Sequence, residues 1–452
     1  MVTKMRSVAF LTLGCKVNFY ETNGMEKAFH DADYEIKEFS QKADIYVINT
    51  CTVTNMADRK SRQMLHKAKK MNPEALIVAV GCYVQAAKEE IEKDESIDLV
   101  IGNNQKAKIV EAVEAYFENH EKRTAIQDMK TFQSYEETVI EDAGEKTRAY
   151  IKIQDGCNQF CTYCIIPYVR GRIRSRKEED IIEEVNALVK KGYQEVVLTG
   201  IHLSSYGVDL QGESDFTKLE GKPLLELMKK VNEIEGLERI RLGSLEPRII
   251  TEEFVENLKK IDKICPHFHL SLQSGCNEVL VRMNRKYTSE EYLQKCGILR
   301  KHFHMPAITT DIIVGFPMET EEEFSITQEF VKKAAFSDVH IFKYSMRKGT
   351  KAALLKDQVD EKIKAERSNR LITLGRTMET EYKSSFIGTI QKVLVEEKTR
   401  IENQEYWVGH NERYIKIAFP VNIREENFHN CIKEVRLKKE SIEGIILSEC
   451  VL

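Results

Sequence analysis

Three cysteines near the middle of the chain follow a short apolar run that is typical of a buried strand. The run is Ala149–Ile153, and Cys157, Cys161 and Cys164 come after it with C-x3-C-x2-C spacing. Zinc sites usually take four protein ligands, often as two separated pairs. Three closely spaced thiolates instead suit three corners of a cubane 4Fe-4S cluster, whose fourth iron stays open to a non-protein ligand. The spacing therefore predicts such a cluster. A zinc knuckle or three incidental thiols is the alternative.

Length and composition favour an intracellular protein of several domains. The 452 residues suffice for about three domains. The 68 basic and 72 acidic residues nearly balance, so any affinity for nucleic acid must come from local patches. The sequence shows neither a signal peptide nor an apolar run of the roughly 20 residues needed to cross a bilayer. Eleven cysteines without an export signal indicate a reducing cytosol and metal ligation rather than disulfides. We therefore expect a cytoplasmic protein that does not enter a membrane.

The N-terminal hundred residues have the pattern of a parallel α/β domain. Short apolar runs alternate with amphipathic stretches, and the predicted strands are Val8–Leu13, Ile45–Ile48, Leu76–Val80 and Leu99–Ile101. Cys15, Cys51 and Cys82 each follow one of the first three strands. Because the carboxyl ends of parallel strands meet at one edge of a sheet, the three thiols should lie together there. We interpret them as a second three-thiolate metal site. Small buried residues that close strands are the alternative.

The central part of the chain predicts a partial or complete β/α barrel. Its expected strands are Ala149–Ile153, Glu195–Leu198, Arg239–Leu242, His267–Leu272, Ile308–Val314 and Asp338–Tyr344. Ligands of such barrels bind at the carboxyl ends of the strands. Glycine and polar residues gather at those ends, so the expected cofactor-binding residues there are Gly200, Ser244, Glu246, Gln273, Asp311 and Gly315. The two glycines would let the backbone approach a cofactor closely. An ordinary solvated or capping carboxylate is the alternative for Asp311.

Four alternating arginines come directly after the cysteine motif: Arg170, Arg172, Arg174 and Arg176. In an extended backbone, alternate side chains project from one face. A row of guanidinium groups binds phosphates or carboxylates well, because each offers paired donors in a planar fork. We therefore predict an RNA-binding surface here. A solvated charged strand is the alternative.

The C-terminal residues change to a strand pattern. Five short strands within Gly388–Cys450 predict a small OB-like β-barrel, a scaffold that commonly binds single-stranded nucleic acid. Tyr406, Trp407, Tyr414 and Phe419 are candidates for stacking on bases, although packing in the core explains each of them equally well. The expected division is an N-terminal domain over residues 1–115, a linker over 116–145, a central domain over 146–374 and the small barrel over 375–442.

Several motifs in this order resemble the radical S-adenosylmethionine (SAM) methylthiotransferases along nearly the whole chain. The matching segments are Leu13-Gly14-Cys15-Lys16-Val17-Asn18, Asn49-Thr50-Cys51-Thr52-Val53, Gly81-Cys82-Tyr83-Val84-Gln85 and Gly156–Gly171. The resemblance implies an N-terminal domain with an auxiliary cluster, a radical SAM barrel and a C-terminal TRAM domain. It also implies two 4Fe-4S clusters, with SAM as both the radical source and the methyl donor. Tyr163 fills the aromatic place of such cysteine motifs, so the resemblance implies that it contacts SAM.

One segment bears on the substrate. Thr199-Gly200-Ile201-His202-Leu203-Ser204-Ser205-Tyr206-Gly207 most resembles the members that act on N6-threonylcarbamoyladenosine beside the tRNA anticodon. We therefore expect His202 to lie near the adenine substituent. Members that act on N6-isopentenyladenosine, or on an aspartate of a ribosomal protein, tend to differ at Ile201-His202-Leu203, and both substrates remain alternatives.

The family chemistry implies further partners. Carbon 2 of adenine carries a hydrogen without useful acidity, so a radical must remove it, and no side chain is required as an acid or base. The resemblance implies a flavodoxin-like or ferredoxin-like electron donor and a tRNA anticodon stem-loop as substrate, and we expect a monomer. An electron-transfer protein with two clusters, or an RNA-binding protein with structural clusters, would be the non-enzymatic alternatives. The roles of Cys265, Cys276, Cys296, Cys431 and Cys450 are not assigned by the sequence.

Overall fold

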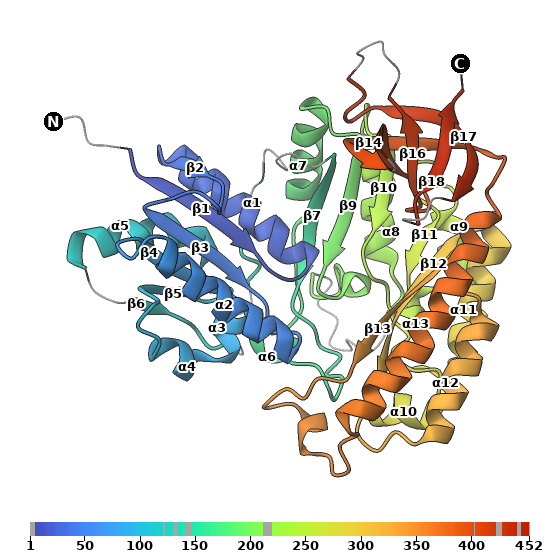
Figure 1. Ribbon diagram of the computed structural model, residues 1–452, viewed down its shortest axis with the longest axis horizontal. Coiled ribbons are helices and arrows are strands. Elements are labelled where there is room, and N and C mark those ends of the chain that lie inside the picture. The colour runs from blue at the N-terminus through green and yellow to red at the C-terminus, as the bar shows by residue number, and fades with distance from the viewer. Residues whose placement is uncertain are drawn as a thin grey trace.

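The computed structural model describes residues 5–120, 123–129, 134–138, 140, 147–210, 219–401, 403–421, 427–440 and 444–451. Much of the expected linker, including residues 141–145, lies outside these ranges. Three parts are visible in Figure 1: a parallel sheet with its helices, a central curved sheet, and a small barrel at the C-terminal end. Within the described ranges, no helix is both long and apolar enough to cross a bilayer.

The N-terminal part is a six-stranded parallel sheet with the order β2-β1-β3-β4-β5-β6. The strands are β1 (Ser7–Thr12), β2 (Glu35–Lys37), β3 (Ile45–Thr50), β4 (Leu76–Gly81), β5 (Leu99–Ile101) and β6 (Arg123–Ala125). The helices are α1 (Lys16–Asp31), α2 (Asn55–Met71), α3 (Cys82–Ala86), α4 (Lys88–Glu92) and α5 (Ile109–Asn119). Every residue of β3 and β4 is buried, which explains their uninterrupted apolar character.

The four strands predicted for this part are present, and two further strands were missed. Both β2 and β6 have only three residues and lack the apolar run that marks the equally short β5 in the sequence. Strand β6 pairs with β5, so it belongs to the N-terminal sheet although it lies within the expected linker. The N-terminal domain therefore extends beyond residue 115.

The central part contains the six predicted strands in a partial barrel. Strands β7 (Arg148–Asp155), β8 (Arg174–Ser175), β9 (Glu195–Gly200) and β10 (Arg239–Leu242) form one sheet, and β11 (His267–His269), β12 (Ala307–Val314) and β13 (Asp338–Lys343) form the other. Isolated parallel bridges, Ile240 to Ile264 and Leu245 to Leu270, join the two sheets. The helices are α6 (Ile166–Val169), α7 (Glu178–Lys190), α8 (Lys222–Asn232), α9 (Glu252–Leu258), α10 (Asn277–Arg282), α11 (Ser289–His302) and α12 (Glu321–Ala334). Thr288 and Thr320 begin α11 and α12 with capping boxes.

The C-terminal part begins with the long helix α13 (Glu361–Ser384), which packs on β13 (Figure 1). A closed barrel follows, made of β14 (Ile390–Ile401), β15 (Gln404–Asn411), β16 (Lys416–Pro420), β17 (Ile432–Glu440) and β18 (Ile446–Cys450). The expected boundary at residue 442 is too early, because β18 completes the barrel. Helix α13 also crosses the expected boundary between residues 374 and 375.

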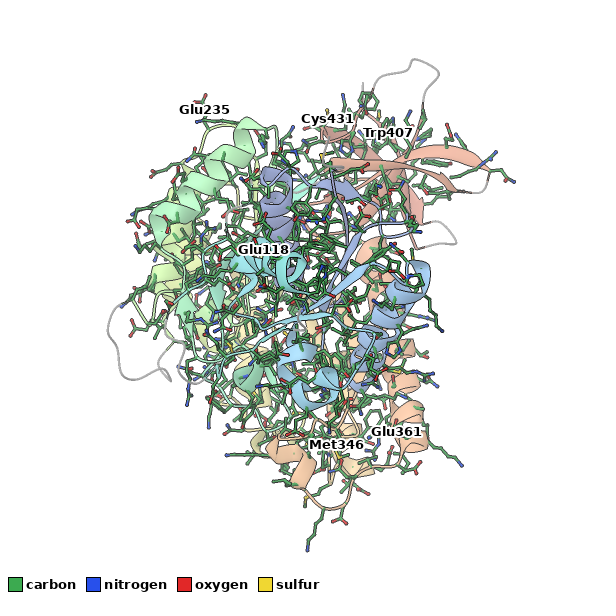
Figure 2. All side chains as sticks on the ribbon, turned by 90° about the vertical axis from the view of Figure 1, so that its left-hand side faces the viewer. Glu118, Glu235, Met346, Glu361, Trp407 and Cys431 are labelled. Atoms are coloured by element: carbon green, nitrogen blue, oxygen red, sulfur yellow. The ribbon has the colours of Figure 1, made fainter. Side chains whose placement is uncertain are left out.

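Two of the four aromatic residues proposed for base stacking lie in the core of the barrel. Trp407 (Figure 2) and Phe419 pack together in its hydrophobic core, with exposed fractions of 4% and 0%. Tyr414 instead stacks between His267 of the central part and His410. Core packing is therefore the explanation for Trp407 and Phe419.

Arginines anchor the barrel to the central sheet. Buried Glu195 in β9 pairs with Arg148 at 3.1 Å and with Arg241 at 2.8 Å. Arg239 and Arg241 also donate to backbone carbonyls of the barrel, at Lys392, His410, Asn411 and Glu412. The backbone of the barrel therefore accepts hydrogen bonds from the buried guanidinium groups of Arg239 and Arg241, which belong to the central sheet.

Candidate functional site

The first group of thiols lies where three neighbouring strands of the N-terminal sheet end. Cys15 immediately precedes α1, Cys51 follows β3, and Cys82 begins α3 directly after β4. Because β1, β3 and β4 are adjacent, these ends meet at one edge. Gly14 has φ +105°, and a Cβ added to it would lie 2.9 Å from the Cβ of Cys51. Only glycine permits this turn and this approach.

The surroundings of these thiols suit thiolates bound to a cluster. Burial raises the pKa of Cys15 and raises that of Cys51 to about 11, so both stay protonated at neutral pH unless a metal holds them. Arg170 donates through Nε to Sγ of Cys82 at 3.2 Å, and the Asn103 amide donates to the same sulfur at 3.6 Å. Donors directed at sulfur are characteristic of iron–sulfur ligands and tune their potential.

The second group of thiols lies on the loop between β7 and α6. The loop is closed because the amide of Cys157 donates to the carbonyl of Gly171 at 3.0 Å, and that of Cys164 to the carbonyl of Cys161 at 3.0 Å. Gly156 has φ +72°, and a Cβ there would lie 1.8 Å from the carbonyl oxygen of Arg172. The sharp turn therefore needs glycine.

This second group also has the environment of cluster ligands. Burial raises the pKa of Cys157 to about 12, and it raises the pKa of Cys164 as well. The amide of Gln159 donates to Sγ of Cys157 at 3.4 Å, and Arg285 donates to Sγ of Cys161 at 3.5 Å. The two groups thus share a donor set: three thiols, with an arginine beside one sulfur. Both fit a 4Fe-4S cluster with one iron left open.

Arg170 is not on a surface that RNA can reach, so the prediction of a phosphate-binding row is wrong for this residue. Its side chain is completely buried. It donates to Glu21 of α1 at 2.8 Å, to Asn18 at 2.7 Å and to Asp155, which ends β7, at 3.1 Å. With its bond to Cys82, Arg170 connects the surroundings of the two cysteine groups.

The prediction is also wrong for Arg174 and Arg176. Both are buried: Arg174 donates to backbone carbonyls, and Arg176 pairs with Glu184. The physical reason is that the segment is not one extended strand, since α6 and a turn at Gly171 precede the two-residue strand β8. Arg172 alone is exposed, with its guanidinium 4.4 Å from the ring centre of Phe160.

Sequence reasoning missed Asn18, Glu21, Asp155 and Arg285, which surround the thiols. The signal for the first two was present, because Asn18 and Glu21 follow Cys15 at three-residue spacing and so lie on one face of a helix. Asp155 directly precedes the cysteine motif, but nothing local marks it as buried. No local signal identifies Arg285, which lies 124 residues after Cys161.

A cavity of about 210 Å³ adjoins Cys164 and contains three of the predicted cofactor-binding residues. Tyr163, Gln273 and Asp311 line it, together with Thr54 from the N-terminal part. A ligand of a cluster held by Cys157, Cys161 and Cys164 would need such a space beside the thiols. The assignment of these residues to SAM remains a prediction.

Side chains of the protein itself lie close to Gly200 and Gly315, the two glycines predicted to adjoin a cofactor. A Cβ on Gly200 would lie 2.9 Å from Oε1 of Gln154, and one on Gly315 would lie 2.3 Å from Cγ of Lys364. The backbone at these positions is therefore approached by the protein's own side chains. The approach of a cofactor to Gly200 and Gly315 remains a prediction.

Glu246 and His202 form a polar group next to the second cysteine group. Although burial favours its neutral form, Arg285, His202 and Arg248 hold the pKa of Glu246 well below its usual range. Arg285 contacts both Glu246, at 3.4 Å, and Cys161. His202 bonds through Nδ1 to Ser205 at 2.6 Å and lies 3.6 Å from Glu246. Contact of His202 with substrate remains a prediction.

A larger cavity of about 400 Å³ lies where the three parts meet. It is lined by Lys16 of α1, Ser244 and Asp311 of the central part, and Tyr414 of the barrel. Burial, followed by the charges of Arg241 and Arg148, lowers the pKa of Lys16. Asp311 lines both cavities, so they adjoin.

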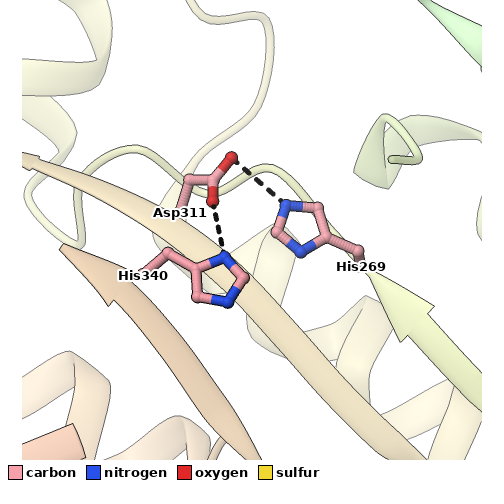
Figure 3. A group of neighbouring side chains, drawn as sticks. All are labelled: His269, Asp311 and His340. Carbon is pink, nitrogen blue, oxygen red and sulfur yellow. Dashed lines mark hydrogen bonds and ion pairs between the residues drawn. The ribbon is translucent and has the colours of Figure 1, made fainter. Parts of the chain in front are cut away.

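Two histidines hold Asp311 between them (Figure 3). Asp311 lies 3.2 Å from Nε2 of His269 and 3.3 Å from Nδ1 of His340. Burial opposes ionisation of Asp311, but hydrogen bonds from the two histidines lower its pKa. Asp311 is thus an engaged carboxylate rather than the freely solvated one that was the alternative.

Comparisons with known proteins agree with this organisation. Residues 151–331 match the Radical SAM superfamily, and residues 7–102 match Uncharacterized protein family UPF0004. A threonylcarbamoyladenosine tRNA methylthiotransferase MtaB of Bacillus subtilis (strain 168) is 44% identical over 92% of this chain and 90% of its own. A tRNA-2-methylthio-N(6)-dimethylallyladenosine synthase of Finegoldia magna is 36% identical over 89% of this chain and 86% of its own.

A solved structure supports the fold alone. The radical S-adenosylmethionine methyltransferase TsrM of Kitasatospora setae superposes with a TM-score of 0.55, covering 75% of this chain and 73% of its own at 14% identity. Sequence identity of 44% over nine-tenths of both chains is decisive for the family. With two cysteine groups, a partial barrel and a closed C-terminal barrel in the expected order, the chain belongs to the radical SAM methylthiotransferase family.

Proposed function

We propose that the protein converts N6-threonylcarbamoyladenosine in tRNA to 2-methylthio-N6-threonylcarbamoyladenosine. The observation that carries the proposal is the 44% identity to the Bacillus subtilis MtaB, supported by 40% identity over 92% of this chain to an MtaB of Aquifex aeolicus (strain VF5). The two cysteine groups support it chemically, because replacing a hydrogen of low acidity needs both a radical source and a sulfur source.

The protein's own residues orient and shield the reacting groups. When bound, the two 4Fe-4S clusters and SAM supply the radical, the sulfur and the methyl group. Cys157, Cys161 and Cys164, the second group, would hold the cluster that binds SAM, and Cys15, Cys51 and Cys82, the first group, would hold the auxiliary cluster. Arg285 and Arg170 each place a positive charge beside a cysteine sulfur. Arg170 also donates hydrogen bonds to Asp155 and Glu21, so it fixes β7 relative to α1. It thereby holds the two cysteine groups at a fixed position relative to each other.

The remaining partners follow from this assignment. The substrate would be the anticodon stem-loop of a tRNA, with the modified adenosine in the cavity where the three parts meet. Arg172 is the residue of the predicted row that remains available for phosphate, because it is exposed. The electron donor would be a small flavodoxin-like or ferredoxin-like protein, and the enzyme would act as a monomer in the cytoplasm.

The test presents the reconstituted enzyme with anticodon stem-loops that carry either threonylcarbamoyladenosine or isopentenyladenosine. Mass spectrometry of the nucleosides should detect the methylthio product only from the first. The second is the main competitor, because the Finegoldia magna relative is named for a dimethylallyladenosine substrate. Conversion of the isopentenyl form alone would contradict the substrate assignment and leave the chemistry intact. Modification of a ribosomal protein alone would contradict the RNA substrate.

A further inference from the structure

The 400 Å³ cavity is built from residues that are far apart in the sequence. Lys16 comes from the start of α1, His267 and His340 from the central strands, and Lys383 and Arg413 from the C-terminal part. Lys16 directly follows Cys15, so this cavity begins beside the auxiliary cysteine group. Through Asp311 it adjoins the smaller cavity that contains Cys164.

The carboxylates that line this cavity already have cationic partners. Asp311 is paired with His269 and His340, and Asp338 lies 3.2 Å from Nε2 of His340. Glu379 is paired with Lys383 at 2.7 Å. None of the three is therefore left to balance an additional positive charge in the cavity.

The cations of the cavity are also satisfied, with one exception. Arg413 donates to the carbonyls of Met305 and His304, at 2.9 and 2.8 Å. Lys16 has neither a hydrogen bond nor an ion pair with any residue in the described ranges. In the same described part of the chain, Nδ1 of His267, on the cavity wall, is buried without a hydrogen-bond partner. Among the residues that the structure describes, the cavity therefore offers one ammonium group without an ion-pair partner and one ring nitrogen without a hydrogen-bond partner.

We propose that Lys16 binds the carboxylate of the threonyl group and so selects threonylcarbamoyladenosine over neutral adenine derivatives. This inference rests on the proposed function. In adenine, carbon 2 and the carbon that bears the N6 substituent both adjoin ring nitrogen 1. A residue beside the auxiliary cysteine group can therefore reach the substituent while carbon 2 faces the reacting groups. An ammonium group and a carboxylate form a charge-assisted hydrogen bond, which neutral substituents cannot replace.

The experiment uses the full-length, anaerobically reconstituted enzyme and two stem-loops, one with threonylcarbamoyladenosine and one with its methyl ester, which lacks the charge. The wild type should bind the acid about 10- to 100-fold more tightly than the ester, the range expected for one hydrogen bond between charged groups. Lys16→Met should bind both equally, and Lys16→Arg should restore part of the preference. Lys27→Met is the matched control, because Lys27 is on the same helix but pairs with Asp31 away from this cavity.

Integrity is checked by iron content and by 5′-deoxyadenosine formation without RNA, both of which Lys16→Met should retain. If Lys16→Met keeps the preference for the acid, the inference is wrong while the proposed function stands. If the wild type binds the acid and the ester equally, the inference is wrong. This outcome does not depend on Lys16→Met, so it counts even if that variant loses iron. If the wild type converts no threonylcarbamoyladenosine at all, the proposed function itself fails.

Discussion

Replacing Arg170 by methionine distinguishes a structural arginine from one that binds RNA. Methionine keeps most of the apolar stem and removes the guanidinium. The change removes one of the two cations that Glu21 and Asp155 share, the other being Lys152, and leaves Sγ of Cys82 without its 3.2 Å donor. Because Arg170 is completely buried, water cannot compensate for these losses.

The size of the effect follows from what remains. Removing one partner of a buried ion pair costs about 3–5 kcal/mol. Glu21 keeps Lys106 and Lys152, and Asp155 keeps Lys152 at 2.7 Å, so we expect the lower end of the range. Burial alone would raise the pKa of Glu21, yet the three cations hold it well below its usual value. Since about 1 kcal/mol shifts the Tm of a unit of about 150–250 residues by about 2–4 °C, the Tm of the central part should fall by roughly 6–12 °C.

The assay measures Tm by scanning fluorimetry under anaerobic conditions, together with tRNA affinity at several salt concentrations. Arg170→Met should lower the Tm and leave the slope of affinity against salt unchanged, because no phosphate contact is lost. Arg172→Met is the matched control: Arg172 is exposed, so its loss should change stability by no more than about 0.5 kcal/mol.

The opposite pattern would refute this reasoning. An unchanged Tm for Arg170→Met, with a salt slope reduced by about one phosphate contact, would mean that the guanidinium faces RNA in solution. It would also mean that the cysteine groups are held together by other contacts.

Three further predictions concern the cysteine groups and the histidine pair. Replacing all three cysteines of the C-x3-C-x2-C motif by alanine should leave about four of eight irons per chain, since each cubane holds four; iron analysis showing none would mean that the sites depend on each other. Cys51→Ala should still cleave SAM but give no methylthio product, and full product formation would exclude the auxiliary role. Hydrogen bonds to Asp311 and Asp338 raise the pKa of His340 from 6.5 to about 10 against the effect of burial, so the charged form stabilises the fold. The Tm difference between wild type and His340→Asn should therefore be largest below pH 6.5 and disappear as the pH rises through about 10; a difference that grows with pH would contradict this.

The first cysteine group shows how far strand patterns reach. Cys15, Cys51 and Cys82 are 36 and 31 residues apart, yet their common location followed from the apolar runs before them. Parallel strands connected by helices place their carboxyl ends at one edge, so the position of each cysteine in its own element was enough. The same logic failed for β2 and β6, because Glu35–Lys37 and Arg123–Ala125 carry charged residues instead of an apolar run.

The arginine row shows where local patterns fail. Alternation identifies a shared face only if the backbone is extended, and here α6 and the turn at Gly171 interrupt it. The partners that bury Arg170 come from α1, far earlier in the sequence. An arginine that binds RNA phosphate and an arginine that binds a distant carboxylate look the same in the sequence. Both need only an anionic partner, and local sequence does not show which anion will lie beside the guanidinium.

The sequence by itself determined the order of the elements, the two groups of three thiols and the family. These features depend on spacing within one element and on the direction of parallel strands, both of which are local or topological. Only the tertiary structure decided that Arg170 lies between the two groups, and that Lys16 lines a cavity with no ion-pair partner in the described part of the chain. Both depend on which distant charges end up as neighbours after the three parts pack together, and burial, not residue type, then decides whether a charge is structural or available to a substrate.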